Sequence, residues 1–279
     1  MTSRNQLLII TDLDATLLTE DYSYEAALPA INELKRLSYP IILNSSKTLA
    51  ELKSLALELE LNAPVIAENG GHIAYPTSFF PSLQDDPSYE IQDGYFTKIN
   101  GLSRRDILKH AHALRDQYGY EFYGFSDWTV EQISAHTGLT NAAAAEAKDR
   151  YVTEPILWND TQERFASFLE SMENIGARAL LGGRFIHLMG AADKADGLNK
   201  VKSFYEEKSP QDTWIAIALG DSPNDQDMLN ASDIAVIIPH QSGARLTTAN
   251  APQVIKATQP ASTGWNEAIL TILKNSTFT

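Results

Sequence analysis

Short, continuous apolar runs alternate in the first part of the chain with segments in which apolar residues recur every three or four positions. The runs at 6–10 (QLLII), 39–43 (YPIIL) and 63–67 (APVIA) are typical of parallel strands that are covered on both faces. The segments between them, 23–37 and 47–61, have the period of helices that bury one face. Strands separated by helices indicate right-handed βαβ units, so we expect a doubly wound parallel sheet.

The same alternation returns near the C-terminus. Helical patterns cover 193–208, 223–232 and 263–276, and strand patterns cover 213–221 and 233–238. These elements can complete the sheet that the first part of the chain begins.

Between about residues 80 and 190 the pattern changes. This stretch opens with turn-forming residues (PTSFFPSLQDDPSYE) and continues through Ala-rich amphipathic segments to the strand-like RFIHLMG. We therefore predict an α/β fold: a doubly wound, Rossmann-like core of residues 1–82 and 191–279, with a second α/β domain inserted at 83–190.

Acidic residues outnumber basic ones by 36 to 22, which gives a formal charge of −14 and argues against nucleic acid or an anionic membrane as partner. No apolar run reaches the roughly 18 residues that a membrane span needs, and the N-terminal segment lacks the features of a signal peptide. The absence of cysteine excludes disulfides, and we expect a cytoplasmic protein. The sequence indicates no particular oligomeric state. We find no zinc-ligand spacing, and we interpret His187 as a half-buried, hydrogen-bonded strand residue.

Two aspartates, Asp12 and Asp14, interrupt the apolar stretch IITDLDATLL just where the first strand should end. Ligands of open α/β sheets bind beyond the carboxyl ends of the strands. Two carboxylates this close repel each other unless a cation compensates, so the pair suits a hard metal such as Mg²⁺. Taken alone, they could equally be turn or N-cap aspartates.

Further polar residues follow other predicted strands. Asp221 and Asp225, in LGDSPND, supply a second acidic cluster. Ser45 and Ser46 open a helix, where hydroxyls and backbone N–H groups can hold a phosphate, although either serine could be a plain N-cap. Lys194 also opens a helix, a poor position for a cation unless an anion is near; the alternative is a solvated surface lysine.

The segments DLDATL, IILNSS with Ser45, ADK with Lys194, and GDSPND occur in the order and approximate separation of the motifs of the haloacid dehalogenase-like phosphatase superfamily, which the chain resembles along its whole length. The insertion at 83–190 lies between the second and third motifs, as in the α/β-capped sugar phosphatases of that superfamily, and AENGG resembles their usual ENG turn. The resemblance therefore implies that 83–190 is an α/β cap that determines substrate specificity. More narrowly, AKDRYVTEPILW, GGRFIHLMGAADK and NSSKT resemble the mannosyl-3-phosphoglycerate phosphatases. One departure is Ala15, where many members have Gly; a small residue still permits the tight turn.

The resemblance implies a role for each motif residue. Asp12 is expected to attack phosphorus and form an aspartyl-phosphate, and Asp14 to protonate the leaving oxygen and then activate water. The expected metal ligands and their supports, for Mg²⁺, are Asp12, Asp14 through its backbone carbonyl, Asp221 and Asp225. The expected phosphate-binding residues are Ser45, Lys194 and Asn224.

A sugar linked to phosphoglycerate also carries a carboxylate, which needs dedicated donors in so acidic a protein. The candidates for substrate binding are Lys47, Arg150, Gly182, Gly183 and Arg184. For Arg150 the alternative is an ion pair with Glu146 on a helix surface.

The resulting functional hypothesis is a Mg²⁺-dependent phosphomonoesterase that hydrolyses mannosyl-3-phosphoglycerate to mannosylglycerate and phosphate. Alternatives with the same chemistry are phosphatases of glucosyl-3-phosphoglycerate, sucrose phosphate or a hexose phosphate, and a phosphomutase. A catalytically silent sugar-phosphate-binding module is a further alternative. Against it stand Asp12, Asp14, Lys194 and Asp221, because binding alone needs neither a nucleophile nor a paired acid.

Overall fold

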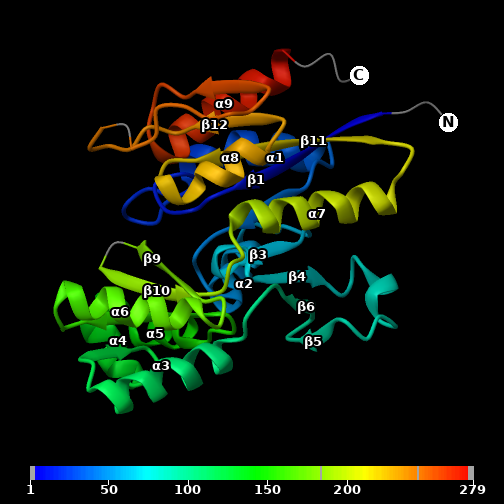
Figure 1. Cartoon of the computed structure of the whole chain (residues 1–279). Coiled ribbons are helices and arrows are strands. Elements are labelled where there is room, and N and C mark those ends of the chain that lie inside the picture. The colour runs from blue at the N-terminus through cyan, green and yellow to red at the C-terminus, as the bar shows by residue number, and fades with distance from the viewer. Residues whose placement is uncertain (1–3, 183, 244, 276–279) are drawn as a thin grey trace.

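The computed structural model describes residues 4–182, 184–243 and 245–275. These residues form two α/β units, each built around its own sheet. In Figure 1 the larger unit occupies the upper part of the view and extends down on the right, and the smaller unit lies at the lower left.

The large sheet carries the first and last thirds of the chain. In sheet order its strands are β13 (Gln253–Lys256), β12 (Ile234–Ile237), β11 (Thr213–Gly220), β1 (Asn5–Thr11), β2 (Ile41–Asn44), β3 (Val65–Ala67), β4 (His72–Pro76), β6 (Tyr95–Ile99) and β5 (Glu90–Gln92). All pairs from β13 to β3 are parallel, and the pairs beyond β3 are antiparallel. The predicted doubly wound parallel core is thus confirmed.

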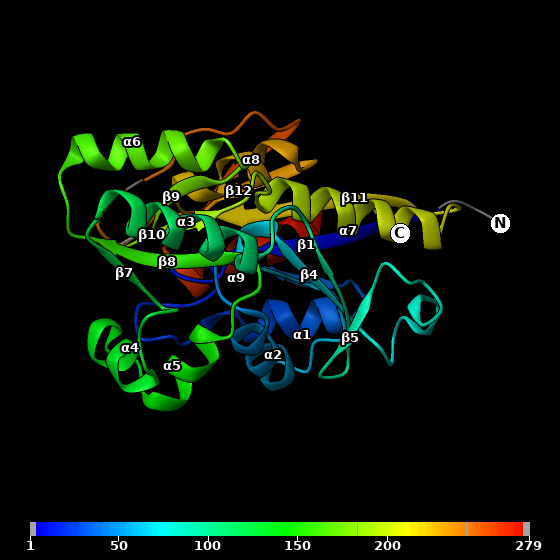
Figure 2. The same cartoon turned by 60° about the horizontal axis from the view of Figure 1, so that its bottom comes forward.

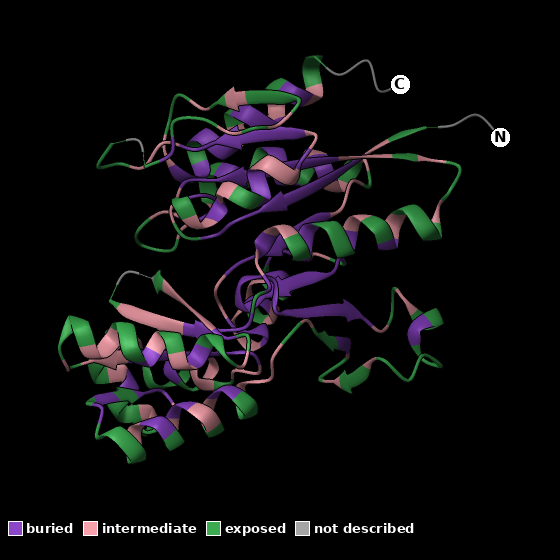
Figure 3. Cartoon of the chain, in the orientation of Figure 1, coloured by how far each residue is buried: buried purple, intermediate pink, exposed green. Residues whose placement is uncertain are grey.

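Helices cover both faces of this sheet, which explains why its central strands are largely apolar. The helices are α1 (Leu28–Arg36), α2 (Leu49–Glu58), α7 (Lys194–Lys208), α8 (Gln226–Ala231) and α9 (Ala261–Asn275). In β1, Leu7 and Ile9 pack with residues of α1, α2 and α9, whereas Leu8 and Ile10 pack with residues of α7 and α8. The buried residues in Figure 3 accordingly concentrate in the central strands.

The second sheet is antiparallel and has four strands: β7 (Phe122–Gly124), β8 (Thr153–Trp158), β10 (Phe185–Met189) and β9 (Arg178–Gly182). Its helices are α3 (Arg104–Tyr118), α4 (Val130–Thr137), α5 (Asn141–Lys148) and α6 (Gln162–Glu173). Figure 2 shows α3 and α6 on one face of this sheet and α4 and α5 on the other. Each face has its own apolar cluster, around Phe168 on the first and around Phe125 and Trp128 on the second.

The four-stranded sheet lies entirely within the predicted insertion, 83–190, but the insertion contains more than this unit. Strands β5 and β6 belong to the same stretch of sequence and pair with the large sheet, with Phe96 opposite Tyr75. The domain limits drawn from the sequence stay predictions, and residues 90–99 extend the core sheet.

Two local differences from the predicted elements have simple causes. The helix expected over 23–37 begins as a short 3₁₀ turn, and α1 starts only at Leu28, with a proline in its first turn. Strand β13 was not predicted, because it is a short and largely exposed edge strand without an apolar run.

Among the described residues, no helix is both long and apolar enough to cross a membrane.

Candidate active site

The pairing of β1 with β11 brings the two acidic motifs together. Thr11 stands opposite Leu219 in the parallel register, and the Asp12 N–H donates to the Leu219 carbonyl at 3.0 Å. Asp12 and Asp221 therefore leave the sheet at the same edge, where its strands have their carboxyl ends. The structure thus brings together the two acidic motifs that follow predicted strands in the sequence.

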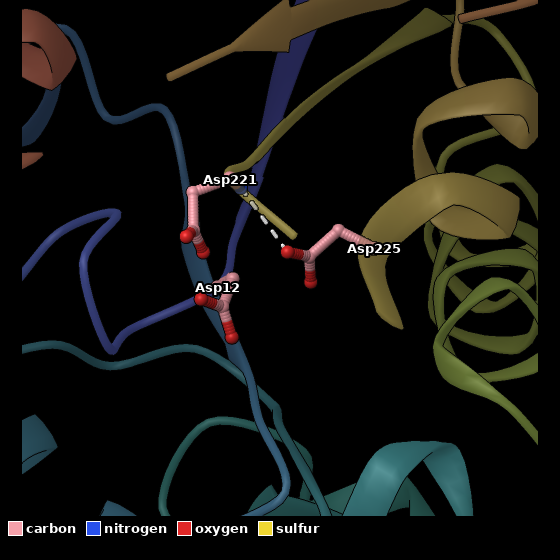
Figure 4. Close-up of side chains that lie close together, drawn as sticks. All are labelled: Asp12, Asp221 and Asp225. Carbon is pink, nitrogen blue, oxygen red and sulfur yellow. Dashed lines mark hydrogen bonds between the residues drawn. The ribbon is translucent and has the colours of Figure 1, made fainter. Parts of the chain in front are cut away.

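Asp12, Asp221 and Asp225 form a compact cluster of carboxylates (Figure 4). Each offers an oxygen, and these oxygens lie within 4.8 Å of one another. The residues are 7%, 2% and 0% exposed, respectively. Burial, reinforced by the Asp225 carboxylate, raises the pKa of Asp12 and raises the pKa of Asp221 to about 6.

Lys194, the first residue of α7, partly neutralises this cluster. Its Nζ donates to Asp12 at 2.5 Å and to Asp225 at 2.6 Å, and the residue is 2% exposed. Although burial opposes the charge, the two carboxylates raise the pKa of Lys194, so it stays protonated. The interpretation of Lys194 as a solvated surface residue is therefore wrong.

The cluster is suited to a hard divalent cation. Lys194 bonds two of the three carboxylates, and the buried Oδ2 of the third, Asp221, has no hydrogen-bond partner among the described residues. Oxygen-only donor sets of this kind are what Mg²⁺ prefers. A cation held by Asp12, Asp221 and Asp225 would compensate the surplus charge.

Asp225 differs from the other two because its second oxygen is already occupied. Asp225 Oδ2 accepts from the backbone N–H groups of Asp221 and Ser222, at 3.1 and 3.0 Å, and from the Ser222 hydroxyl at 3.0 Å. Gly220 permits this packing, since a Cβ there would lie 2.4 Å from the Asp225 Cβ. Asp225 thus fixes the loop that presents Asp221.

Asp14 lies beside the cluster, and its side chain points elsewhere. Its carboxylate is 54% exposed and pairs with Lys47 Nζ at 3.2 Å. Although burial of Lys47 opposes its charge, the carboxylates of Asp14 and Glu51 raise its pKa. Ala15, next in sequence, has φ 62°, in the left-handed region. This explains why glycine suits the position, and it gives the alanine more significance than the sequence suggested.

The expected phosphate ligands lie at the ends of neighbouring elements. Ser45 is buried just after β2, and its hydroxyl accepts from the Lys47 N–H at 3.3 Å, while Ser46 borders open space. The Asn224 amide donates to the Asn69 side chain at 3.0 Å. The phosphate-binding roles of Ser45 and Asn224 stay predictions.

A cavity of about 590 Å³ lies above the carboxylates, between the two units. From the large sheet it is lined by Asp12, Asp14, Ser46, Asn69, Asp221, Ser222, Pro223, Asn224 and Arg245. From the smaller unit it is lined by Leu180, Leu181 and His187.

His187 is half-buried, as expected, but it is not fully hydrogen-bonded. Its Nδ1 is buried and has no partner among the described residues. Burial, with a smaller contribution from the Arg150 charge, lowers the pKa of His187 to about 3. The imidazole is therefore neutral near pH 7, and the residue lines the cavity.

Of the predicted cationic specificity residues, Arg150 lies at the junction of the two units. It donates to Thr153 Oγ1 at 2.7 Å and to the Ser46 carbonyl at 3.3 Å. The alternative ion pair is wrong, because no described ion pair joins Arg150 to Glu146, whose carboxylate accepts from Ser54.

The substrate-binding roles of the glycine-arginine turn stay predictions. Arg184 donates to the His136 carbonyl, within the smaller unit. Gly182 is the last residue of β9, and Gly183 lies outside the described residues. Arg184 is not among the described residues that line the cavity.

Sequence reasoning overlooked Glu68, which joins the two units. Its buried carboxylate accepts from the N–H groups of Tyr151, Val152 and Thr153 at 2.8 to 3.1 Å, and from the Thr153 hydroxyl at 2.6 Å. Its motif partner Gly70 has φ 88°, and a Cβ there would lie 1.7 Å from the Asp193 carbonyl. The ENG turn is therefore the junction that holds the smaller unit beside α7. Gly70 was the sequence feature that could have identified this junction.

Arg245 was also overlooked. It lies in the loop after β12, and its Nη1 approaches Asp221 Oδ2 at 3.5 Å. Its position beyond the carboxyl end of a predicted strand was the signal that could have identified it.

Comparison with known proteins finds similarity over most of the chain. A profile of the haloacid dehalogenase-like hydrolases matches residues 9–259. A glucosyl-3-phosphoglycerate/mannosyl-3-phosphoglycerate phosphatase of Persephonella marina is 35% identical over 96% of this chain and 97% of its own length. A protein of the same description from Methanococcoides burtonii is 34% identical, over 95% and 97%. The fold is shared with a crystal structure from Thermotoga maritima, with a TM-score of 0.64, 15% identity, and coverage of 99% and 98%.

Proposed function

Since the chain belongs to the haloacid dehalogenase-like hydrolases and is a phosphoric monoester hydrolase, we propose that it is a Mg²⁺-dependent phosphatase of mannosyl-3-phosphoglycerate and glucosyl-3-phosphoglycerate. The observation that carries this proposal is the buried cluster of Asp12, Asp221, Asp225 and Lys194 at the base of a cavity. The two relatives' names supply the substrate class.

In the proposed reaction, Asp12 attacks phosphorus in line, the phosphorus–oxygen bond to the glycerate breaks, and an aspartyl-phosphate forms. Asp14, whose half-exposed carboxylate can exchange protons with water, gives a proton to the departing oxygen. Asp14 then takes a proton from the water that cleaves the aspartyl-phosphate, and free phosphate leaves.

Other residues position the reacting groups. Lys194 holds Asp12 and places a positive charge beside the incoming phosphate. Asp12, Asp221 and Asp225 would hold the divalent cation. When bound, the cation neutralises charge between the phosphate and the carboxylates.

The smaller unit supplies a surface that suits an uncharged sugar. Leu180 and Leu181 are apolar, and His187 is neutral near pH 7 because burial lowers its pKa to about 3. A neutral imidazole can exchange hydrogen bonds with hydroxyl groups, and leucines can pack against the C–H face of a ring. This supports a glycosylated substrate over a bare phosphoglycerate.

The test is phosphate release from mannosyl-3-phosphoglycerate, glucosyl-3-phosphoglycerate, 3-phosphoglycerate and mannose 6-phosphate, measured with Mg²⁺ and with EDTA. We expect Mg²⁺-dependent turnover with a preference of at least about tenfold for the two glycosylated phosphoglycerates, roughly what one good polar contact provides. Equal turnover of all four would contradict the substrate class, and phosphate transfer to a second sugar hydroxyl would indicate a mutase. No turnover of any compound would favour the silent binding module.

A further inference from the structure

The cavity lining is strongly unbalanced in charge. Of the described residues that line it, Asp12, Asp14 and Asp221 carry acidic groups, and Arg245 is the one with a cationic side chain. The proposed substrates carry two anionic groups, a phosphate and a carboxylate. The phosphate has Lys194 beneath it, but Lys194 is buried against Asp12 and Asp225 and does not extend into the cavity lining.

Arg245 is well placed for the second anion. Its side chain is 47% exposed, and its Nη1 lies 3.5 Å from Asp221 Oδ2. That oxygen has no hydrogen-bond partner among the described residues, so this contact is an ion pair without a hydrogen bond. A guanidinium has five N–H donors in a planar fork, and the fork matches a carboxylate.

Because Arg245 pairs with Asp221, the availability of its guanidinium to a substrate anion depends on the metal. Asp221 belongs to the carboxylate cluster that would hold the cation. A cation that takes the charge of Asp221 leaves the guanidinium without its compensating anion, at the edge of the cavity. An anionic group of the substrate then restores the balance.

Resting on the proposed function, we propose that Arg245 is the specificity residue that binds the carboxylate of the glycerate moiety. Only the short glycerate backbone separates that carboxylate from the phosphorus atom. The distances agree, because Arg245 contacts Asp221, and a carboxylate oxygen of Asp221 lies within 4.8 Å of one of Asp12, the attacking residue.

The cations proposed from the sequence have other partners. Lys47 pairs with Asp14, Arg150 donates to Thr153 and to a backbone carbonyl of the core, and Arg184 donates to a carbonyl within the smaller unit. Their charges and donors are used for the structure itself. Arg245 thus replaces them as the residue that distinguishes a sugar acid from a neutral sugar phosphate.

The experiment compares kcat/KM for mannosyl-3-phosphoglycerate with kcat/KM for its analogue in which a neutral amide replaces the carboxylate. In Arg245→Gln we expect the ratio of the two values to fall about 10- to 100-fold, the usual loss for a hydrogen bond to a charged group. Arg245→Lys should recover part of the ratio, because it keeps the charge and loses the fork. Lys256→Gln, an exposed lysine of β13, is the matched control for the change in net charge and should keep the wild-type ratio.

A second readout does not depend on turnover. In the Asp12→Asn background, calorimetric titration with mannosyl-3-phosphoglycerate in the presence of Mg²⁺ should show weaker binding, by a similar factor, once Arg245→Gln is added. If wild type hydrolyses the substrate and the ratio stays unchanged in Arg245→Gln, this proposal is wrong and the proposed function stands. If wild type hydrolyses neither glycosylated phosphoglycerate, both are wrong.

Discussion

The two sides of the cavity are built in opposite ways. The catalytic floor, Asp12, Lys194, Asp221 and Asp225, is at most 7% exposed; Lys194 joins Asp12 to Asp225, and Asp225 accepts from the backbone N–H of Asp221. The roof, Leu180, Leu181 and His187, belongs to the smaller sheet; Leu181 is 80% exposed, and His187 Nδ1 has no partner among the described residues. Buried ionic contacts hold Asp12, Lys194 and Asp225 of the floor in place, whereas the roof presents more exposed side chains that form no ion pair among the described residues.

This difference assigns catalysis to the floor and substrate selection to the roof. Because the charged groups of the floor hold one another in place, they are preorganised for a single reaction. Preorganised charge is the main source of electrostatic catalysis. Side chains of the roof can be replaced without disturbing the charged groups of the floor. Changes in the floor should therefore affect all substrates alike, and changes in the roof or at its edges should affect them unequally.

The largest expected effect is the loss of the nucleophile. Asp12→Asn should reduce kcat by at least about 10³-fold for every phosphate ester, since an amide does not form the aspartyl-phosphate. Initial rates of phosphate release measure this loss, and an unchanged far-UV circular dichroism spectrum serves as the control for folding. Near-normal turnover would remove Asp12 from the proposed reaction.

The next effect concerns the stability of the floor. Lys194→Met leaves Asp12 and Asp225 buried without their cation, so the free energy of unfolding should fall by about 3–5 kcal/mol. Urea denaturation near pH 7 measures it. Lys256→Met, on the exposed edge strand, should cost less than about 0.5 kcal/mol. A similar small cost for Lys194→Met would show that the floor does not depend on this ion pair.

Glu68 joins the core, which carries the floor, to the smaller unit, which carries the roof. Weakening this junction tests how far the two depend on each other. Glu68→Gln keeps the size of the side chain but loses the charge that accepts from residues 151–153, at an expected local cost of about 1.5–3 kcal/mol. Hydrogen exchange of the amides at 151–153 should accelerate, while those of β1 stay protected. Glu90→Gln, on the exposed strand β5, is the control, and equal exchange in both variants would contradict the role of Glu68.

The smallest effect is a pH dependence that belongs to the roof. The unfolded chain protonates His187 near pH 6.5, whereas burial lowers its pKa to about 3 in the folded protein. The unfolded state therefore binds the extra proton as the pH falls from about 6.5 toward 3, and stability is lost over that window. Between pH 7 and pH 5, wild type should lose about 1–2 kcal/mol more than His187→Gln in urea denaturation. Identical losses would show that His187 is solvated.

The sequence predicted the floor far better than the roof, and the reason is geometric. Strand ends of a parallel sheet meet at one edge, so Asp12 and Asp221 could be brought together from their positions alone. Residues of the roof come from a hairpin whose direction depends on packing between the units, which no local pattern records. The same limit applies to β5 and β6, which join the core sheet from within the predicted insertion. Arg150 and Arg184 had suggestive neighbours in sequence, but their donors go to the protein itself.

The most direct test of the account is to trap the covalent intermediate on the floor. The protein would be mixed with Mg²⁺ and mannosyl-3-phosphoglycerate labelled in its phosphate, quenched in acid within milliseconds, and digested for peptide mass spectrometry. We predict label on the peptide that contains Asp12, and no label after EDTA treatment or in Asp12→Asn. Turnover with label on a different residue, or label at Asp12 that EDTA does not abolish, would contradict the central claim.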